Sequence, residues 1–299
     1  MTATAAIHTS EKCLLRPGNT NCGGCGMSVG LTMLGRALSE ADDSCTLVIP
    51  ACCGIVTAGA FPTTSYGVPT IATTFASSPA VASGVASIRD LNDEPGQVIC
   101  WAGDGGTYDI GLATLSAAAE RNENIIYMCY DNEIYGNTGG QRSSATPAGA
   151  RTTTTPWGKI EGKKDIMSIM VAHRIPYAAT LSLAHPDDFA QKMSTALSIK
   201  GMRFLLLHSP CPTGWKSEPE DSIALVRLAV GSGLFPVYEV FDGATYRVSV
   251  KPDGTDPAEY FHRQRRFKDE EIDLDATRRA CSDRMQRLQS LAEQFPPDK

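Results

Sequence analysis

The stretch CWAGDGGTYDIGLATLSAAAERNENIIYMCYDN constrains the fold more than any other part of the sequence. It contains, in order, an apolar run of strand composition, a glycine-rich turn at Gly103, Gly105 and Gly106, a helical segment and a second apolar run. Two parallel strands joined by a crossover helix form a βαβ unit. The sequence therefore predicts a parallel sheet covered by helices.

Short strands alternate with longer helices on both sides of this unit. Strand composition is found at 46–50, 97–102, 124–130, 176–181 and 203–208, and helical composition in SSPAVASGVASIRDL, TYDIGLATLSAAAERN and HPDDFAQKMSTALSIKG. This pattern predicts an α/β fold with a doubly wound, mostly parallel sheet. After Cys211 the alternation stops, and VYEVFDGATYRVSV predicts a β-hairpin.

We divide the chain into an N-terminal segment (1–45), a central α/β domain (46–215) and a C-terminal extension (216–299). The extension is expected to end in a helix whose apolar stripe packs on this domain or on another subunit; the stripe consists of Leu274, Cys281, Met285, Leu288 and Leu291. The Ser/Thr-rich segment 138–156 is the one long irregular stretch. Its position after the βαβ unit favours a functional loop.

Charge and hydropathy exclude several classes of function. The chain has 299 residues and a formal net charge of −6, which gives no reason to expect nucleic acid or an anionic membrane as a partner. No apolar run approaches the about 18 residues of a membrane span, and MTATAAIHTSEKC lacks the apolar core of a secretory signal. We therefore expect a cytoplasmic protein.

The glycine-rich turn predicts a phosphate site that includes a metal ion. Backbone amides at a helix N-terminus attract anions. Asp104 lies among the glycines and would repel a bare phosphate, so a cation, most naturally Mg²⁺, is expected between them. Asn132 follows the next strand, where its amide oxygen can reach the same ion. A plain tight turn is the structural alternative, and a Rossmann site is disfavoured because GDGGTY is not G-x-G-x-x-G.

The ten cysteines are not expected to form a disulfide framework in a cytosolic chain of this size. Cys100 and Cys129 lie in apolar runs and are expected in the core. The pair Cys22 and Cys25 is a C-x-x-C motif, which alone fits a redox pair, half of a zinc site or half of an iron–sulfur site.

Further cysteines follow predicted strands, where sites of open α/β sheets gather. They are Cys52 or Cys53 after TLVIPA, and Cys211 in the proline-flanked turn SPCPTGW. Two more ligands from these positions would complete a cluster with the C-x-x-C pair.

Taken together, these motifs resemble the β subunit of the pyruvate and related 2-oxoacid:ferredoxin oxidoreductases. The matching stretches, in the family's order, are NCGGCGMS, ACCGIVTAGAFPTTSYGVP, the SGVAS helix, the segment from GDGGTYDIG to SSATPAGA, SPCPTGW and YFHRQRRF. The resemblance implies a [4Fe-4S] cluster held by four cysteines, Cys22, Cys25, Cys53 and Cys211. Cys53 is chosen over Cys52 by its distance from Phe61-Pro62.

The same resemblance implies a thiamine diphosphate site, with a sheet of the thiamine diphosphate-binding type. Mg²⁺ would be held by Asp104, Asn132 and the backbone carbonyl of Ile134. The segments Gly103 to Gly106 and Asn132 to Asn137 would surround the diphosphate, Asn137 would face the reacting 2-oxoacid, and Cys53 would also border the cofactor. The chain departs from the family at Met27, where a carboxylate is common.

The implied activity is the coenzyme A-dependent oxidative decarboxylation of a 2-oxoacid, with electrons passing through the cluster to ferredoxin or another acceptor. Pyruvate, 2-oxoisovalerate, phenylglyoxylate and oxalate remain open as substrates. A catalytic glutamate is expected from another subunit, so the resemblance implies α, γ and ferredoxin-like δ partners. The alternatives are a non-redox thiamine diphosphate decarboxylase or synthase subunit, an oxalate-type enzyme that does not use coenzyme A, and an iron–sulfur or zinc scaffold.

Overall fold

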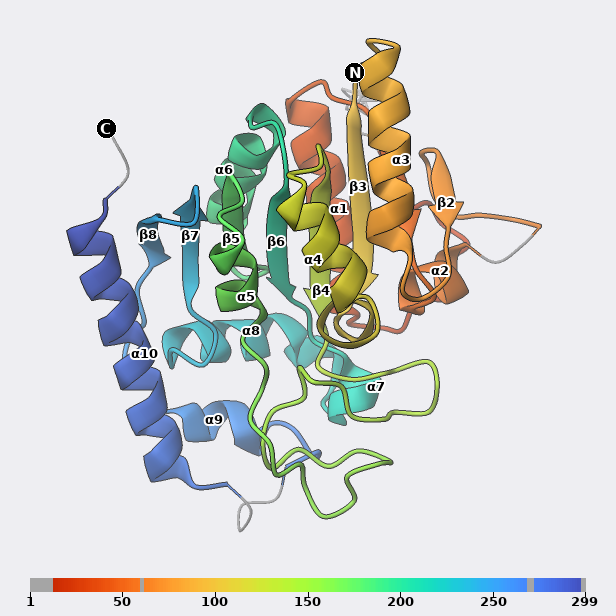
Figure 1. The fold of residues 1–299 in the computed structure, drawn as a ribbon. Helices are drawn as coiled ribbons and strands as arrows, with labels where there is room; N and C mark the ends of the chain where they lie inside the picture. Colours follow the sequence, from red (N-terminus) through yellow and green to blue (C-terminus); the bar gives the residue numbers. More distant parts are fainter. Residues whose placement is uncertain (1–12, 60–61, 268–271, 297–299) are drawn as a thin grey trace, which may run out of the picture.

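The computed structural model describes residues 13–59, 62–267 and 272–296. Phe61 and residues 1–12, on which two of the expectations depend, lie outside the described residues. The described strands form one eight-stranded sheet in the order β2-β1-β3-β4-β6-β5-β7-β8 (Figure 1). The strands are β1 (Cys45–Ile49), β2 (Thr70–Ala72), β3 (Gln97–Gly103), β4 (Ile126–Asp131), β5 (Tyr177–Ser182), β6 (Arg203–His208), β7 (Val237–Phe241) and β8 (Thr245–Val250).

Helices cover both faces of this sheet, as the doubly wound pattern predicts. Helices α3 and α4 pack against each other on one face, and α1 and α6 pair on the other (Figure 1). The helical elements are α1 (Gly26–Glu40), α2 (Cys53–Ala58), α3 (Ser78–Leu91), η1 (Gly105–Asp109), α4 (Leu112–Glu120), α5 (Ile166–Ala172), α6 (Pro186–Ser198), α7 (Pro212–Trp215), η2 (Pro219–Asp221), α8 (Ser222–Gly231), α9 (Pro257–His262) and α10 (Leu274–Gln294).

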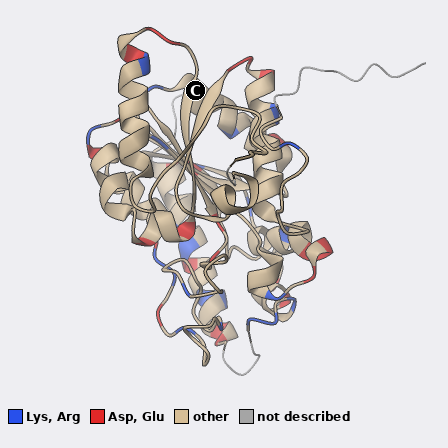
Figure 2. Ribbon diagram, turned by 90° about the vertical axis from the view of Figure 1, so that its right-hand side faces the viewer, with Lys and Arg blue, Asp and Glu red and all other residues tan. Residues whose placement is uncertain are grey.

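The six strands β1 to β6 pair in parallel, and β7 and β8 extend the sheet in antiparallel fashion. Strands β4, β5 and β6 are buried along their whole length, because helices cover them on both faces. Figure 2 accordingly shows charged residues on helices and loops around strands that are almost free of them. The predicted α/β class and mostly parallel sheet are confirmed.

The predicted hairpin is β7–β8, and the predicted C-terminal helix is α10, which packs on β8. Three residues of its predicted stripe, Cys281, Met285 and Leu288, are buried there. Since β7 and β8 belong to the same sheet as the central strands, the C-terminal extension packs on the domain. The segment boundaries at 45/46 and 215/216 stay a prediction. Among the described residues, no helix combines the length and apolar composition needed to cross a membrane.

The carboxyl ends of the central parallel strands share one edge of the sheet, the lower edge in Figure 1. The residues that follow β1, β3, β4 and β6 therefore meet there. Helix η1, helix α7 and the long irregular segment between β4 and α5 surround this edge. Ligands of open α/β sheets bind at this position.

Candidate functional site

The glycine-rich turn after β3 leads directly into η1 and α4. Gly105 is required by packing, because a Cβ there would lie 2.2 Å from the ring of Tyr135. A Cβ on Gly106 would make only ordinary contacts, with Phe75 at 3.5 Å. The protein itself therefore does not demand glycine at residue 106, whereas a ligand that approaches the backbone closely would.

Three oxygen-bearing groups converge at the sheet edge. The terminal amide atom of Asn132 that faces Asp104 lies 2.8 Å from Asp104 Oδ1 and 2.8 Å from the Ile134 carbonyl oxygen. Without a cation, the amide nitrogen fits there and donates to both. With the amide reversed, the Asn132 oxygen lies 2.8 Å from each of the other two oxygens. Neighbouring ligands of an octahedral Mg²⁺ lie about 2.8–3.0 Å apart when each is about 2.0–2.1 Å from the ion. The sequence-predicted magnesium ligands thus lie together and fit the ion.

Asp104 is 2% exposed, and its carboxylate accepts a hydrogen bond from Ser143 Oγ. Burial, together with the nearby charge of Asp131, raises the pKa of Asp104 well above its ordinary range. Lys163 Nζ pairs with Asp131 at 2.5 Å and offsets the rise in the pKa of Asp104 only in part. Because burial and Asp131 outweigh Lys163, a cation that contacts Asp104 directly would stabilise its carboxylate.

A buried group of charges fixes the backbone between Asn132 and Ile134. Glu133 has a φ of 61°, a strained value for a residue with a side chain. Its carboxylate pairs with Lys163 Nζ at 2.8 Å and Arg266 Nη2 at 2.6 Å. Burial alone would raise the pKa of Glu133, but the charges of Lys163 and Arg266 hold it at about 2. No motif in the sequence singles out these three residues for the site, although Arg266 lies in the stretch YFHRQRRF.

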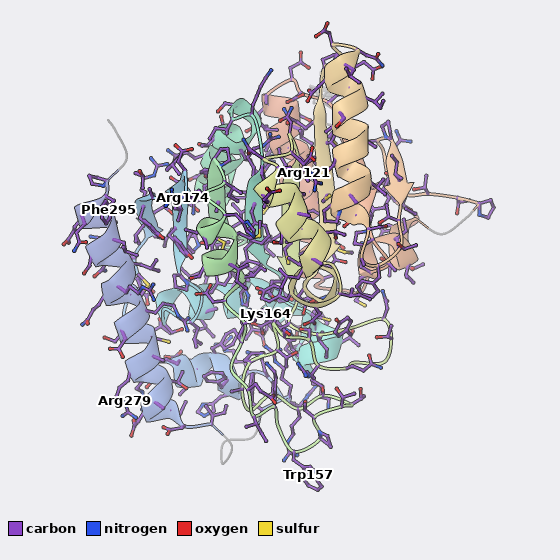
Figure 3. The ribbon with its side chains drawn as sticks, viewed as in Figure 1. Arg121, Trp157, Lys164, Arg174, Arg279 and Phe295 are labelled. Carbon is purple, nitrogen blue, oxygen red and sulfur yellow. The ribbon has the colours of Figure 1, made fainter. Side chains whose placement is uncertain are left out.

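The Ser/Thr-rich segment packs against this turn, as its position suggested. Besides Ser143, it contributes Thr146, whose hydroxyl donates to the Glu133 carbonyl at 2.7 Å. Ser144 N–H donates to Asp109 Oδ2 at 3.1 Å. The segment thus contacts both the glycine-rich turn with η1, at Asp104 and Asp109, and the turn after β4, at Glu133. Trp157, which directly follows this segment, is 85% exposed and projects away from the sheet (Figure 3).

A cavity of about 290 Å³ lies behind this arrangement, between the sheet and α10. Glu133, Lys163 and His208 form its inner wall, and Leu288 belongs to its apolar side. Its lining does not include Asp104, Asn132 or Ile134, so it is not the cavity between the converging oxygens.

The four predicted cluster cysteines are brought to one region by contacts between their loops. The N–H of Gly26, next to Cys25, donates to the Pro210 carbonyl at 3.0 Å, and Ser222 Oγ donates to the Gly24 carbonyl at 2.7 Å. The first bond joins the C-x-x-C loop to the turn that carries Cys211, and the second joins it to the start of α8. The pKa of Cys211 is consistent with this proximity. Burial raises it most, and the nearby thiols of Cys25 and Cys22 raise it further, to about 11.

Cys53 belongs to this group and Cys52 faces elsewhere. Burial, followed by the charges of Cys211, Cys52 and Cys25, raises the pKa of Cys53 to about 12. The Cys52 thiol instead contacts the Tyr130 hydroxyl and the backbone of Ile55, Gly54 and Gly103. Among the described residues, no group of three or more His, Cys, Asp or Glu could hold a single metal ion. A [4Fe-4S] cluster has a different requirement, because each thiolate binds a different iron.

Two further sequence-predicted positions lie apart from these groups. Asn137 is exposed in the turn after Tyr135, at the surface of the site. Its contact with a 2-oxoacid stays a prediction. Met27 is 2% exposed and packs in the core at the start of α1, so the position where the resemblance led us to expect a carboxylate is part of the apolar packing here.

Comparison with known proteins agrees with this geometry. Residues 52–208 match the family model described as thiamine pyrophosphate enzyme, C-terminal TPP binding domain. A solved structure titled 2-oxoglutarate:ferredoxin oxidoreductase, from Magnetococcus marinus, has the same fold, with a TM-score of 0.64 and 21% identity over 87% of this chain and 92% of that one.

Two curated relatives are much closer in sequence. The ketoisovalerate oxidoreductase subunit VorB of Pyrococcus horikoshii is 42% identical over 293 residues, which is 93% of each protein. The pyruvate synthase subunit PorB of Methanothermobacter marburgensis is 42% identical over 265 residues, covering 86% of this chain and 91% of that protein. This chain is therefore a thiamine diphosphate-binding oxidoreductase subunit and belongs to the β subunits of the 2-oxoacid:ferredoxin oxidoreductases.

Proposed function

We propose that this β subunit binds Mg²⁺-thiamine diphosphate and one [4Fe-4S] cluster, and that its complex oxidatively decarboxylates an aliphatic 2-oxoacid to an acyl-coenzyme A. The convergence of Asp104, Asn132 and Ile134 supports the magnesium site more than any other observation. Relatives named for pyruvate and for ketoisovalerate are equally similar, which supports the aliphatic class.

The cofactor supplies the electron sink for decarboxylation when it is bound. The chain's own residues supply its position. Asp104, Asn132 and the Ile134 carbonyl would hold the metal, and the backbone amides after Gly103 would bind the diphosphate. Asn137, exposed at the rim, would orient the substrate.

The cysteines would place the electron acceptor next to this site. Cys211 Sγ lies 3.2 Å, and Ile134 Cγ2 2.8 Å, from the position of a Cβ on Gly214, so the proposed cluster and metal loops adjoin. Clusters held by four thiolates reach the low potentials that ferredoxin acceptors need. We propose that electrons leave through this cluster, one at a time, to a ferredoxin-type acceptor.

Partner subunits would complete the site. Trp157 and Ile160, on the loop that borders it, are 85% and 91% exposed. Exposed apolar groups next to a functional site suggest a protein interface. We propose that an α subunit covers this face and donates the glutamate that thiamine chemistry needs, with γ and ferredoxin-like δ subunits in the same cytoplasmic complex.

The choice between the adjacent cysteines can be tested directly. Cys53→Ser is expected to lose the cluster, because serine cannot replace a thiolate ligand of iron here. Cys52→Ser is expected to keep it, since a hydroxyl can still bond to Tyr130. Iron, acid-labile sulfide and the visible absorption of the two complexes provide the measurement. Loss of iron in Cys52→Ser alone would reverse the assignment.

The function as a whole is tested on the complex, purified anaerobically after co-expression with its partners. We expect stoichiometric thiamine diphosphate, one cluster's iron and sulfide in addition to the amount bound by the ferredoxin-like subunit, and viologen reduction that requires both coenzyme A and pyruvate or 2-oxoisovalerate. Thiamine diphosphate without this additional iron would identify a non-redox enzyme. Full turnover of oxalate without coenzyme A would identify an oxalate-type enzyme. Bound metal without thiamine diphosphate would identify an iron–sulfur or zinc scaffold.

A further inference from the structure

Trp215 connects two parts of the chain that the proposed function gives to different cofactors. Its side chain is fully buried. Its backbone N–H donates to the Cys211 carbonyl at 2.7 Å, and its indole Nε1–H donates to the Asn132 carbonyl at 2.8 Å. One residue thus joins the turn of a proposed cluster ligand to the backbone of a proposed magnesium ligand.

A second contact joins the same two loops without the indole. Gly214 precedes Trp215, and a Cβ on it would lie 2.8 Å from Ile134 Cγ2 and 3.2 Å from Cys211 Sγ. The loops are therefore packed so closely that no side chain fits between them. Because the two loops are closely packed here, a movement of Cys211 is expected to shift Ile134 as well.

Arg266 fixes the orientation of this connection. Its guanidinium lies 4.3 Å over the Trp215 ring, and its backbone N–H donates to the Trp215 carbonyl at 3.3 Å. The same guanidinium pairs with Glu133, which lies between Asn132 and Ile134. Arg266 therefore connects the Trp215 ring to Glu133, which directly follows the Asn132 carbonyl that accepts the indole N–H.

We propose that Trp215 is a positioning residue that couples the [4Fe-4S] cluster to the Mg²⁺-thiamine diphosphate site. The oxidation state of the cluster then changes the affinity for the cofactor. By linkage, bound cofactor changes the reduction potential of the cluster by the same free energy. This inference rests on the proposed function, because it requires both groups in this chain.

The test compares the wild-type complex with Trp215→Phe, which keeps an aromatic ring and removes Nε1–H. Leu91→Ala is the control, because Leu91 is 78% exposed at the C-terminal end of α3, close to the start of β3 and away from both proposed sites. Calorimetry gives the Kd of Mg²⁺-thiamine diphosphate with the cluster oxidised and with it reduced by dithionite. A potentiometric titration followed by electron paramagnetic resonance gives the midpoint potential with and without the cofactor.

In the wild type and Leu91→Ala, we expect the two oxidation states to differ in Kd by about fivefold or more. The cofactor should shift the potential correspondingly, by about 40 mV for fivefold in a one-electron couple. In Trp215→Phe, iron and sulfide should remain, the Kd should rise about tenfold because the buried Asn132 carbonyl loses its donor, and the dependence on oxidation state should fall to less than twofold.

If Trp215→Phe keeps the wild-type dependence of Kd on the oxidation state of the cluster, the proposal is wrong. If that variant does not assemble, 3-benzothienylalanine at residue 215 keeps the shape and replaces the N–H by sulfur. If this isostere keeps the wild-type dependence of Kd on oxidation state, Trp215 has no positioning role. The same conclusion follows if it loses both cofactors and assembly together. A wild-type complex without iron or without thiamine diphosphate would refute the proposed function itself, which keeps the two failures distinct.

Discussion

Replacing Asp104 by asparagine is expected to weaken Mg²⁺-dependent binding of thiamine diphosphate by more than about a hundredfold. Changes to groups that only support a metal ligand already cost about 10- to 100-fold. Asp104 provides the anionic oxygen among the three that converge, so its loss should cost more. Calorimetry on the purified complex measures the effect, and Asp187→Asn, an exposed carboxylate in α6, is the control.

The same substitution should stabilise the chain in the absence of metal. Asp104 is buried near Asp131, and asparagine removes this repulsion while it can still accept the hydrogen bond from Ser143. We expect a gain of about 1 kcal/mol or more in the free energy of unfolding of the isolated chain in EDTA. A substitution that lowers both cofactor affinity and metal-free stability would mean that Asp104 is structural rather than a metal ligand.

Much of the fold follows from the sequence because its strands are buried on both faces. Runs such as RFLLLH have no polar face, and β6 coincides with that run. Strand β2 was missed because Thr70 to Ala72 form a short edge strand with little apolar signal. Helices α7 and α9 were missed because four to six residues carry no recognisable period.

The part of the site that the sequence predicts consists of residues at strand ends. Asp104 and Asn132 could be paired in advance because parallel neighbours end at the same edge. The pairing of Glu133 with Lys163 and Arg266 could not be predicted, since no short-range pattern relates residues so far apart in the chain. Trp215 belonged to a quoted motif, but its indole partner depends on how α7 packs below β4.

The choice between Cys52 and Cys53 illustrates a different limit. The two thiols follow β1, and both lie near functional groups. Which one faces Cys211 depends on the rotation with which α2 begins, and one residue along a helix changes direction by about 100°. Sequence spacing cannot resolve that rotation, whereas the surroundings of each thiol can.

Replacing Arg266 by methionine is expected to produce the largest loss of stability among these variants. Arg266 is 1% exposed and neutralises Glu133, which is also buried. Breaking a buried ion pair from one side leaves an uncompensated charge and costs about 3–5 kcal/mol. Lys163 still pairs with Glu133, so we expect the lower end of that range. Urea denaturation of the isolated chain, followed by circular dichroism, measures the change.

Arg265→Met is the matched control, because the adjacent arginine is 71% exposed and pairs with Glu218 at the surface. That change should cost less than about 1 kcal/mol. Glu133→Gln combined with Arg266→Met should recover part of the loss, since the double variant has no buried carboxylate that lacks one of its two cations. Equal losses at Arg265 and Arg266, or no recovery in the double variant, would show that the buried pair does not hold the backbone of Glu133 in its strained conformation. The magnesium loop would then depend on the Thr146 hydroxyl and the Trp215 indole instead.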